Sequence, residues 1–488
     1  MKCVDFTGGV VGVLASGRLV RFAAWLSGFI LWMGVGTART ASAATAAKPN
    51  IVFILADDLG YGDLGCYGQE RIRTPRLDRM AREGTRFTQV YSGATVCAPS
   101  RCVLMTGKHT GRARVRGNAG QANPLAQSLR FGDVTVARVL SDVGYRTGLV
   151  GKWGLGDAGV AEPGLPERHG FEHMFGYLNQ THAHNYYPTF LWRNGQRVAL
   201  RNVVTNATPS GAGVASVRVD YTHDLFAEEA LRFIRDHRDR TFFLYLALTA
   251  PHANNEAGKR GMEVPDLGEY AGLDWPEPQK GHAAMITRMD GDVGRVLDLL
   301  KDLGLDEKTV VVFTSDNGPH REGGNDPAFN RSSGPFRGIK RNHTDGGIRV
   351  PMIVRWPGTV PSERVDGSLW WFADVLPTLA ELAGAPVPSG VDGVSVVKTW
   401  KGGRQPELDD RFLYWEFHEG GFQQAGRWKQ WKILRNRKDG PSELYDLSRD
   451  VGESDNVAAA HPELVRELEE RLKAARVDSE DWPVGARR

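Results

Sequence analysis

Cysteine is scarce in this chain, with four residues among 488. Cys3 lies in an N-terminal segment that we expect to be removed, which leaves Cys66, Cys97 and Cys102, an odd number. So few cysteines exclude a small fold held together mainly by disulfides. If Cys97 has another use, Cys66 and Cys102 either pair with each other or stay as small buried residues, and the sequence leaves both possibilities open.

The chain also lacks a strong excess of charge of either sign. It has 61 lysines and arginines against 58 aspartates and glutamates, for a formal net charge of +3. This balance gives no reason to expect a nucleic acid partner. Internal repeats and low-complexity tracts are missing as well. With an ordinary apolar content of 41%, the 488 residues are ample for one large domain and a smaller one.

Long apolar runs are missing after the N-terminus. Residues 22–35 form an apolar run that follows Arg18 and Arg21 and precedes Ala41-Ser42-Ala43, a small-residue cleavage pattern. This layout predicts a secretory signal peptide over residues 1–43. An uncleaved membrane anchor is the alternative, but the run is short for a membrane span. We expect a secreted or periplasmic protein with no membrane association once the signal is removed.

Several short apolar segments alternate with helical patterns in the rest of the chain. Residues 50–56, 242–248 and 309–314 are typical of parallel strands buried on both faces. Residues 134–142, 225–237 and 285–303 show helical spacing of apolar side chains. The alternation predicts an α/β fold, a large doubly wound and mostly parallel sheet flanked by helices over residues 48–387. Shorter strand-like pieces and a helix at 462–475 predict a smaller C-terminal α+β subdomain over 388–488.

Acidic pairs follow two of the predicted strands. Asp57 and Asp58 come directly after the strand at 50–56, and Asp316 and Asn317 follow the strand at 309–314. Alone, each pair is a common turn or helix cap. The carboxyl ends of parallel strands meet at one edge, and three carboxylates that close repel each other unless a cation lies among them. Oxygen ligands suit calcium first and magnesium second, and there is no His-rich or Cys-rich set for zinc.

Four basic residues lie in loops that follow predicted strands or at a helix start: Arg101, Lys152, His252 and Lys340. Taken separately, each is an ordinary solvated charge. Together with a metal ion they would neutralise a tetrahedral oxyanion, which transfer of a sulfuryl or phosphoryl group requires.

The string from Cys97 to Gly107 is the most specific motif of the chain. Pro99 suits the first turn of a helix, which would place Cys97 at the positive end of that helix. By itself, such a thiol is a buried structural residue. The full string, Cys-x-Pro-Ser-Arg with Thr-Gly five residues after the arginine, resembles the maturation signature of the sulfatase family. The similarity extends in motifs over residues 48–350, and residues 443–447 also look like the family.

The resemblance implies a role for each of these residues. Cys97 would be oxidised to formylglycine by a formylglycine-generating enzyme, and the hydrate of this aldehyde would be the nucleophile. The implied metal ligands are Asp57, Asp58, Asp316 and Asn317, completed by converted Cys97. Arg101 would contact the hydrate, Lys152 and Lys340 would bind the sulfate, and His252 would face the leaving-group oxygen. The implied activity is calcium-dependent hydrolysis of sulfate esters.

One position departs from the family pattern. The family commonly reads Gly-Lys-Trp-His-Leu-Gly, whereas this chain has glycine at position 154. The missing histidine normally helps to remove a proton from the second hydroxyl of the hydrate. Either another base serves, with His184 or His182 as candidates, or the sulfated intermediate turns over slowly.

The substrate is expected to be a sulfated carbohydrate rather than a simple aryl sulfate. This expectation depends on the aromatic and histidine-rich loop at 182–187 and on His418-Glu419. His182, His184 and His418 are therefore the candidate substrate-binding residues. One alternative is a phosphodiesterase or phosphonate monoester hydrolase on the same scaffold. Another is a non-catalytic glycan-binding relative, which the glycine at position 154 makes conceivable.

Overall fold

The computed structural model describes residues 14, 48–119, 123–159 and 161–484. The signal peptide expected at 1–43 lies outside these residues, apart from residue 14. From Lys48 onward the chain forms one compact unit. Within the described ranges, no helix combines the length and the apolar character that crossing a membrane requires. The boundary expected at 387/388 stays a prediction.

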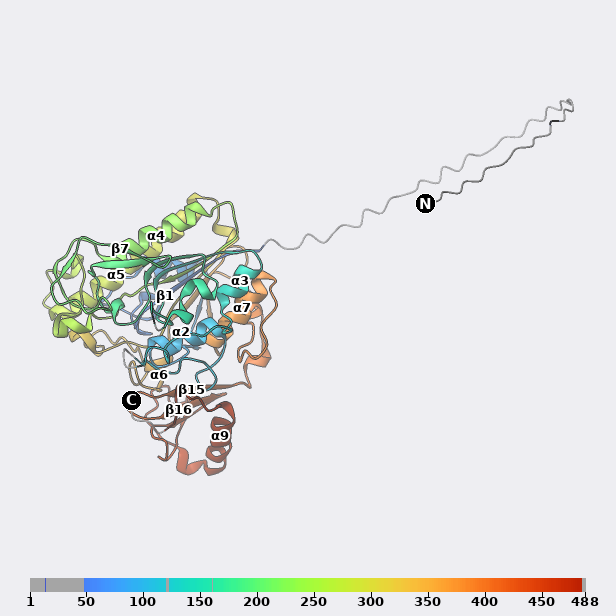
Figure 1. Ribbon diagram of the computed structural model, residues 1–488. Helices are drawn as coiled ribbons and strands as arrows, with labels where there is room; N and C mark the ends of the chain where they lie inside the picture. The colour runs from blue at the N-terminus through green and yellow to red at the C-terminus, as the bar shows by residue number, and fades with distance from the viewer. Residues whose placement is uncertain (1–13, 15–47, 120–122, 160, 485–488) are drawn as a thin grey trace, which may run out of the picture. The chain divides into compact units, whose positions relative to one another are not determined.

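A mixed sheet forms the centre of this unit (Figure 1), and ten strands of the described chain belong to it. Its middle strands β11, β1, β10, β4 and β5 are parallel, whereas β12, β6 and β7 run antiparallel to their neighbours. The predicted mostly parallel sheet is therefore confirmed. In spatial order the strands are β13 (Arg364–Asp366), β2 (Thr85–Phe87), β12 (Met352–Arg355), β11 (Thr309–Ser315), β1 (Asn50–Ala56), β10 (Phe242–Ala247), β4 (Arg146–Lys152), β5 (His173–Tyr177), β6 (Phe190–Arg193) and β7 (Gln196–Ala199).

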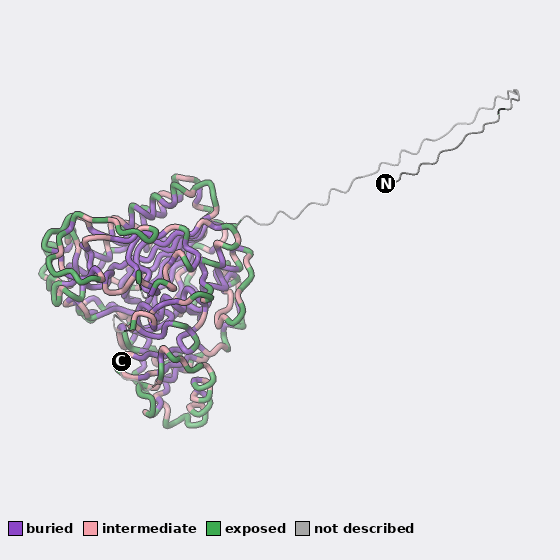
Figure 2. The backbone as a smooth tube through the Cα atoms, in the orientation of Figure 1, coloured by how far each residue is buried: buried purple, intermediate pink, exposed green. Residues whose placement is uncertain are grey.

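Both faces of the sheet are covered by helices. In β1, Phe53 belongs to one hydrophobic core cluster, while its neighbours Val52 and Ile54 belong to another on the opposite face. Figure 2 shows the central strands buried between these layers. A strand covered on both sides needs apolar residues throughout, which explains the unbroken run at 50–56. One face packs against α2 (Cys97–Thr106), α3 (Val136–Asp142) and α7 (Val375–Ala383), and the other against α1 (Pro75–Arg82), α4 (Thr222–Asp236) and α5 (Glu277–Asp302).

The region between β4 and α4 contributes three strands to the main sheet, although its sequence has no clear strand pattern. Strand β5 pairs in parallel with β4, and β6 and β7 continue the edge. Gly176 in β5 has φ +149, and a Cβ there would lie 1.9 Å from the carbonyl oxygen of Gly151 in β4. A glycine is thus required where these strands approach, and it weakens the apolar pattern by which a strand is recognised.

The C-terminal part is a small antiparallel sheet with one helix, as predicted. Its strands are β15 (Phe412–Phe417), β16 (Gln423–Trp428), β17 (Trp431–Arg435) and β18 (Glu443–Asp446), and α9 (Pro462–Ala475) packs on them through Leu468 and Leu472. The buried Lys432 ammonium connects this sheet to the large domain, because Nζ lies 2.6 Å from Asp345 Oδ1. Glu453 of the C-terminal part also contacts this ammonium, with Oε1 3.0 Å from Nζ. The remaining strands and α-helices of the described chain are β3 (Val90–Tyr91), β14 (Trp370–Trp371), β8 (Val203–Val204), β9 (Ala215–Val217), α6 (Asp345–Ile348) and α8 (Val397–Trp400).

Candidate active site

The acidic residues predicted as metal ligands meet at the carboxyl ends of β1 and β11. The backbone N–H of Asp58 donates to Asp316 Oδ1 at 3.1 Å, and Asn317 Nδ2 donates to Asp58 Oδ1 at 2.6 Å. These residues and Asp57 are fully buried. Asp58 has φ +64, a left-handed conformation that aspartate tolerates better than most side chains. The parallel neighbours β1 and β11 therefore bring together residues more than 250 positions apart in the sequence.

Cys97 is the first residue of α2, next to this cluster. Val96 before it is extended and Gly107 after Thr106 has φ +67, so the motif and the helix coincide. The Cys97 side chain is buried, and burial raises the pKa of the thiol, although Lys152 acts in the opposite direction. The thiol thus stays protonated at neutral pH. An unmodified cysteine here is a poor nucleophile.

Arg101 connects α2 to the ends of two strands. Its Nε and Nη2 donate to Asp316 Oδ2 at 3.0 and 2.9 Å, and Nη1 donates to the carbonyl oxygen of Lys152 at 2.8 Å. Nη2 also lies 3.4 Å from Asp57 Oδ2. The guanidinium is fully buried with these acids, so its charge offsets their repulsion and its planar geometry sets their spacing.

The two predicted sulfate-binding lysines each pair with one acid. Lys152 Nζ donates to Asp57 Oδ2 at 2.6 Å, and Lys340 Nζ donates to Asp58 Oδ2 at 2.8 Å. Burial alone would lower the pKa of each lysine, but Asp57 and Asp58 outweigh it and raise both pKa values. Both ammonium groups are therefore charged, and they project positive charge next to Cys97.

His252 is neutral and faces Lys340. Its Nδ1 lies 2.7 Å from the carbonyl oxygen of Ala253, which assigns the ring proton to Nδ1 and leaves Nε2 as an acceptor. Lys340 Nζ lies 3.3 Å from this Nε2. Burial and then the charge of Lys340 lower the pKa of His252 well below its usual range. Of this pair, Lys340 carries the proton.

The acidic cluster suits a hard cation. Ligand atoms of Asp57, Asp58 and His252 lie within 4.8 Å of one another. Within the described residues, Asp57 Oδ1 and Asn317 Oδ1 are buried without a hydrogen-bond partner. Burial and the neighbouring charge of Asp57 raise the pKa of Asp316. Carboxyl groups this close together resist being ionised at the same time, and a further positive charge among them would relieve that repulsion. Unpartnered oxygens among carboxylates are the ligands that calcium and magnesium prefer.

The structure brings only one of the three predicted substrate-binding histidines to this cluster. The His184 ring stacks on His252 with centroids 5.1 Å apart, and its Nδ1 lies 3.1 Å from Glu256 Oε1. His182 is enclosed: its Nε2 contacts the Phe190 carbonyl oxygen at 3.0 Å, and burial lowers its pKa to about 3. The two histidines lie on one 3-10 turn and point in different directions.

His418, the third candidate, lies against the C-terminal segment. Its Nε2 is 3.0 Å from Glu416 Oε1, and its ring packs against Phe422 and Trp482. The adjacent Glu419 accepts from the backbone N–H of Asn118 through its Oε1 at 3.3 Å. Neither His182 nor His418 contacts Cys97 or the acidic residues at the ends of β1 and β11.

Other residues near the cluster were not predicted from the sequence. The Cys97 Sγ lies 3.1 Å from Gln180 Oε1 and 3.9 Å from Asn118 Oδ1. On another side, Glu322 Oε1 lies 3.7 Å from Lys340 Nζ and accepts from Arg341 Nη1 at 2.5 Å. These residues come from loops without a motif. One signal in the sequence was usable, the position of Gln180 shortly after β5. This signal indicates a place near the site only once β5 is known to pair with β4.

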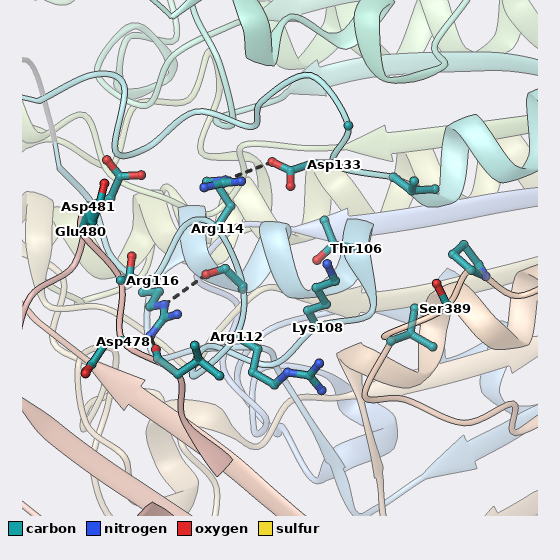
Figure 3. A pocket seen from close by; sticks show the side chains of 17 residues that line it. Thr106, Lys108, Arg112, Arg114, Arg116, Asp133, Ser389, Asp478, Glu480 and Asp481 are labelled. Atoms are coloured by element: carbon teal, nitrogen blue, oxygen red, sulfur yellow. Dashed lines mark hydrogen bonds and ion pairs between the residues drawn. The ribbon is translucent and has the colours of Figure 1, made fainter. Parts of the chain in front are cut away.

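A separate cavity of about 680 Å³ lies beside Thr106, at the opposite end of α2 from Cys97 (Figure 3). Its lining mixes basic and acidic side chains, and Arg114 pairs with Asp133 at 3.3 Å. None of the predicted site residues lines it. The cavity is therefore not the continuation of the acidic cluster.

Two family models match the chain. The model described as Sulfatase matches residues 49–385, and the model described as N-sulphoglucosamine sulphohydrolase, C-terminal, matches residues 339–478. The solved structure of Ps i-CgsB in complex with k-i-k-neocarrahexaose is similar, with a TM-score of 0.76 and 27% identity over 90% of this chain and 95% of that one.

Curated relatives agree with these matches. The chain is 30% identical to N-acetylgalactosamine-6-O-sulfatase of Bacteroides thetaiotaomicron, over 88% of this chain and 93% of that protein. It is 33% identical to arylsulfatase A of Homo sapiens, over 91% of this chain and 90% of that protein. Because the sulfatase model covers most of the chain and the similarity to named sulfatases is nearly as long as the proteins themselves, this chain belongs to the sulfatase family and is a sulfatase.

Proposed function

We propose that this sulfatase removes sulfate esters from carbohydrates, with formylglycine made from Cys97 by a maturing enzyme and with bound calcium. The observation that carries the proposal is that Cys97 lies together with buried carboxylates and buried basic side chains at the ends of β1, β4 and β11. One relative is named an N-acetylgalactosamine-6-O-sulfatase, and one similar structure holds a neocarrahexaose. We therefore take 6-sulfated N-acetylgalactosamine as the first sugar ester to test. The layout of residues 1–43 supports a secreted or periplasmic location.

Conversion of Cys97 is needed because its thiol is buried and protonated. The converted residue supplies a geminal diol, of which one hydroxyl attacks sulfur and the other permits release of sulfate by elimination. A serine has no second hydroxyl and would stop at a stable ester. Lys152 lies close enough to Cys97 to oppose the rise that burial causes in the pKa of its thiol, and Arg101 bonds the Lys152 carbonyl oxygen, so the positive charges of both side chains favour an anionic oxygen at residue 97.

A calcium ion fits the donor set of Asp57, Asp58, Asp316, Asn317 and the converted residue 97. Bound there, it would supply a positive charge that polarises sulfate oxygens and the nucleophile. The buried oxygens of Asp57 and Asn317 that lack a hydrogen bond support this assignment. Arg101 keeps the carboxylates in place through its two bonds to Asp316. Magnesium is the less favoured ion, because a crowded set of protein oxygens suits the larger cation.

Lys340 and His252 form the proton-donating side of the site. Lys340 carries the proton and donates to the neutral Nε2 of His252 at 3.3 Å. Nε2 of His252 takes up a proton from Lys340 and passes it to the departing oxygen of the ester, which leaves as an alcohol, while Nδ1 keeps its own proton on the carbonyl oxygen of Ala253. Their near-complete burial excludes water from this path. His184, stacked on His252, lies where the leaving sugar would contact the protein.

Replacing His252 by glutamine is expected to slow sugar sulfates more than aryl sulfates. A sugar alkoxide needs the proton, so kcat should fall about 10²- to 10⁴-fold. The 4-nitrophenolate leaves without one, so its kcat should fall about tenfold or less. His169→Gln replaces another buried histidine, whose ring nitrogens, within the described residues, bond the backbone carbonyls of Asp133 and Pro163, and it should leave both rates unchanged. Equal losses for both esters would show that His252 does not donate the proton.

Paired esters test the proposed function. Protein produced together with a formylglycine-generating enzyme is assayed on 4-nitrophenyl sulfate, on 4-nitrophenyl phosphate and on 6-sulfated N-acetylgalactosamine. We expect kcat/KM for the sulfate to exceed that for the phosphate at least about a hundredfold, and the sugar to release sulfate. Preference for the phosphate would favour the phosphodiesterase alternative. Release from the aryl ester alone would restrict the proposal to aryl sulfates.

A further inference from the structure

Position 154 lies directly beside Gln180. The backbone N–H of Gly154 donates to the carbonyl oxygen of Leu178 at 2.9 Å, so the residues after β4 run alongside those after β5. Gly154 has φ +81, and a Cβ built on it would lie 2.3 Å from Gln180 Nε2. No side chain fits at position 154 while Gln180 keeps its place. The glycine and the glutamine are thus two parts of one arrangement.

The Gln180 amide faces the reactive residue. Its Oε1 lies 3.1 Å from Cys97 Sγ, where it accepts the thiol hydrogen. Its Nε2 is buried and, among the described residues, has no hydrogen-bond partner. A buried amide donor without a partner is costly, which points to an oxygen-bearing group that binds next to residue 97. Neither histidine considered as a replacement base contacts Cys97, since His182 is enclosed and His184 pairs with Glu256.

We propose that Gln180 is the residue that positions the hydrate of formylglycine 97. Its Oε1 accepts a hydrogen bond from the hydroxyl that does not attack, and its Nε2 donates to an oxygen of the bound sulfate. The inference rests on the proposed function. An amide does not take up a proton at neutral pH, so Gln180 orients this hydroxyl and does not act as its base.

The step that Gln180 assists is the release of sulfate from residue 97. The second hydroxyl loses its proton to water, its oxygen forms the carbonyl bond, and the bond from the same carbon to the sulfate oxygen breaks. The electron pair of that bond leaves with the sulfate, and the aldehyde is restored. A hydroxyl that rotates away from this geometry slows the elimination, so the sulfated residue should accumulate when Gln180 is removed.

The test uses Gln180→Ala and the conservative Gln180→Asn in protein that carries the aldehyde. The first readout is taken without substrate: an aminooxy probe should label residue 97 at least severalfold faster in Gln180→Ala, because the hydrate loses a stabilising contact. The second readout is taken during turnover: kcat should fall about 10- to 100-fold with a smaller change in KM, and the tryptic peptide 87–101 should carry sulfate. The matched control Thr181→Ala changes the next residue and keeps its backbone carbonyl oxygen, which accepts from the His184 N–H, so both readouts should stay the same.

Gly154→Ala supplies an independent variant. Its Cβ displaces the Gln180 amide, so it should reproduce both effects, and the double variant Gly154→Ala/Gln180→Ala should lose little more than either alone. Unchanged labelling and unchanged kcat in folded Gln180→Ala, checked by its melting temperature, would overturn the inference. Absence of the aldehyde from the unaltered protein would instead overturn the proposed function. The two failures are therefore distinguishable.

Discussion

Replacing Cys97 by alanine is expected to lower kcat/KM for a sulfate ester by at least about 10⁴-fold. The replacement removes the side chain that would carry the nucleophile and leaves the surrounding charges only to bind the ester. Cys102→Ala is the matched control, because Cys102 is a second buried cysteine of α2 that packs in the hydrophobic core. That variant should keep its activity within about threefold, although it loses some stability.

The mass of the tryptic peptide 87–101 checks the chemical basis of this result. Conversion of Cys97 removes one sulfur and two hydrogens and adds one oxygen. Active protein should contain this lighter peptide, in proportion to its specific activity. A fully active preparation whose peptide carries only the intact thiol, or a Cys97→Ala protein with nearly normal turnover, would rule out the formylglycine mechanism.

Removal of divalent ions is the second change with a large expected effect. After treatment with a chelator, activity should fall at least about a hundredfold, because the attacking and sulfate oxygens lose their polarising charge. Calcium should restore it more fully than magnesium. Calcium at about a hundred times its dissociation constant should also stabilise the folded protein by about 2.7 kcal/mol, since it binds the native site alone.

Variants of two buried aspartates in the same loop distinguish calcium binding at the proposed site from a general effect of salt on stability. Asp57→Asn alters a proposed ligand and should abolish the calcium-dependent rise in melting temperature. Asp63→Asn should keep that rise, because Asp63 bonds the Gly60 backbone and lies outside the ligand set. Burial raises the pKa of Asp63 to about 6, so its buried charge is unfavourable and a neutral amide of the same shape is tolerated there. An equal calcium response in both variants would place the ion elsewhere.

The sequence by itself determined the central strands, the motif helix and the residues that meet at their ends. These features are local: an apolar run such as 50–56 predicts a doubly buried strand, and a polar pair after it belongs to the carboxyl edge. Parallel pairing then brings Asp57 and Asp316 together without any further information. The sequence also predicted Lys152 just after a strand and Cys97 at a helix start, and the structure has Lys152 as the last residue of β4 and Cys97 as the first residue of α2.

Only the tertiary structure decided which loop residues reach the cluster. His182 and His184 are indistinguishable in the sequence, yet a single turn encloses one and presents the other. Gln180 faces Cys97 because β5 pairs with β4, and two glycines lie in close contact where the strands meet. Glycines at this contact interrupt the apolar pattern by which a strand is predicted from the sequence. Strand ends follow from local periodicity, whereas loop side chains are positioned by packing between segments far apart in the chain.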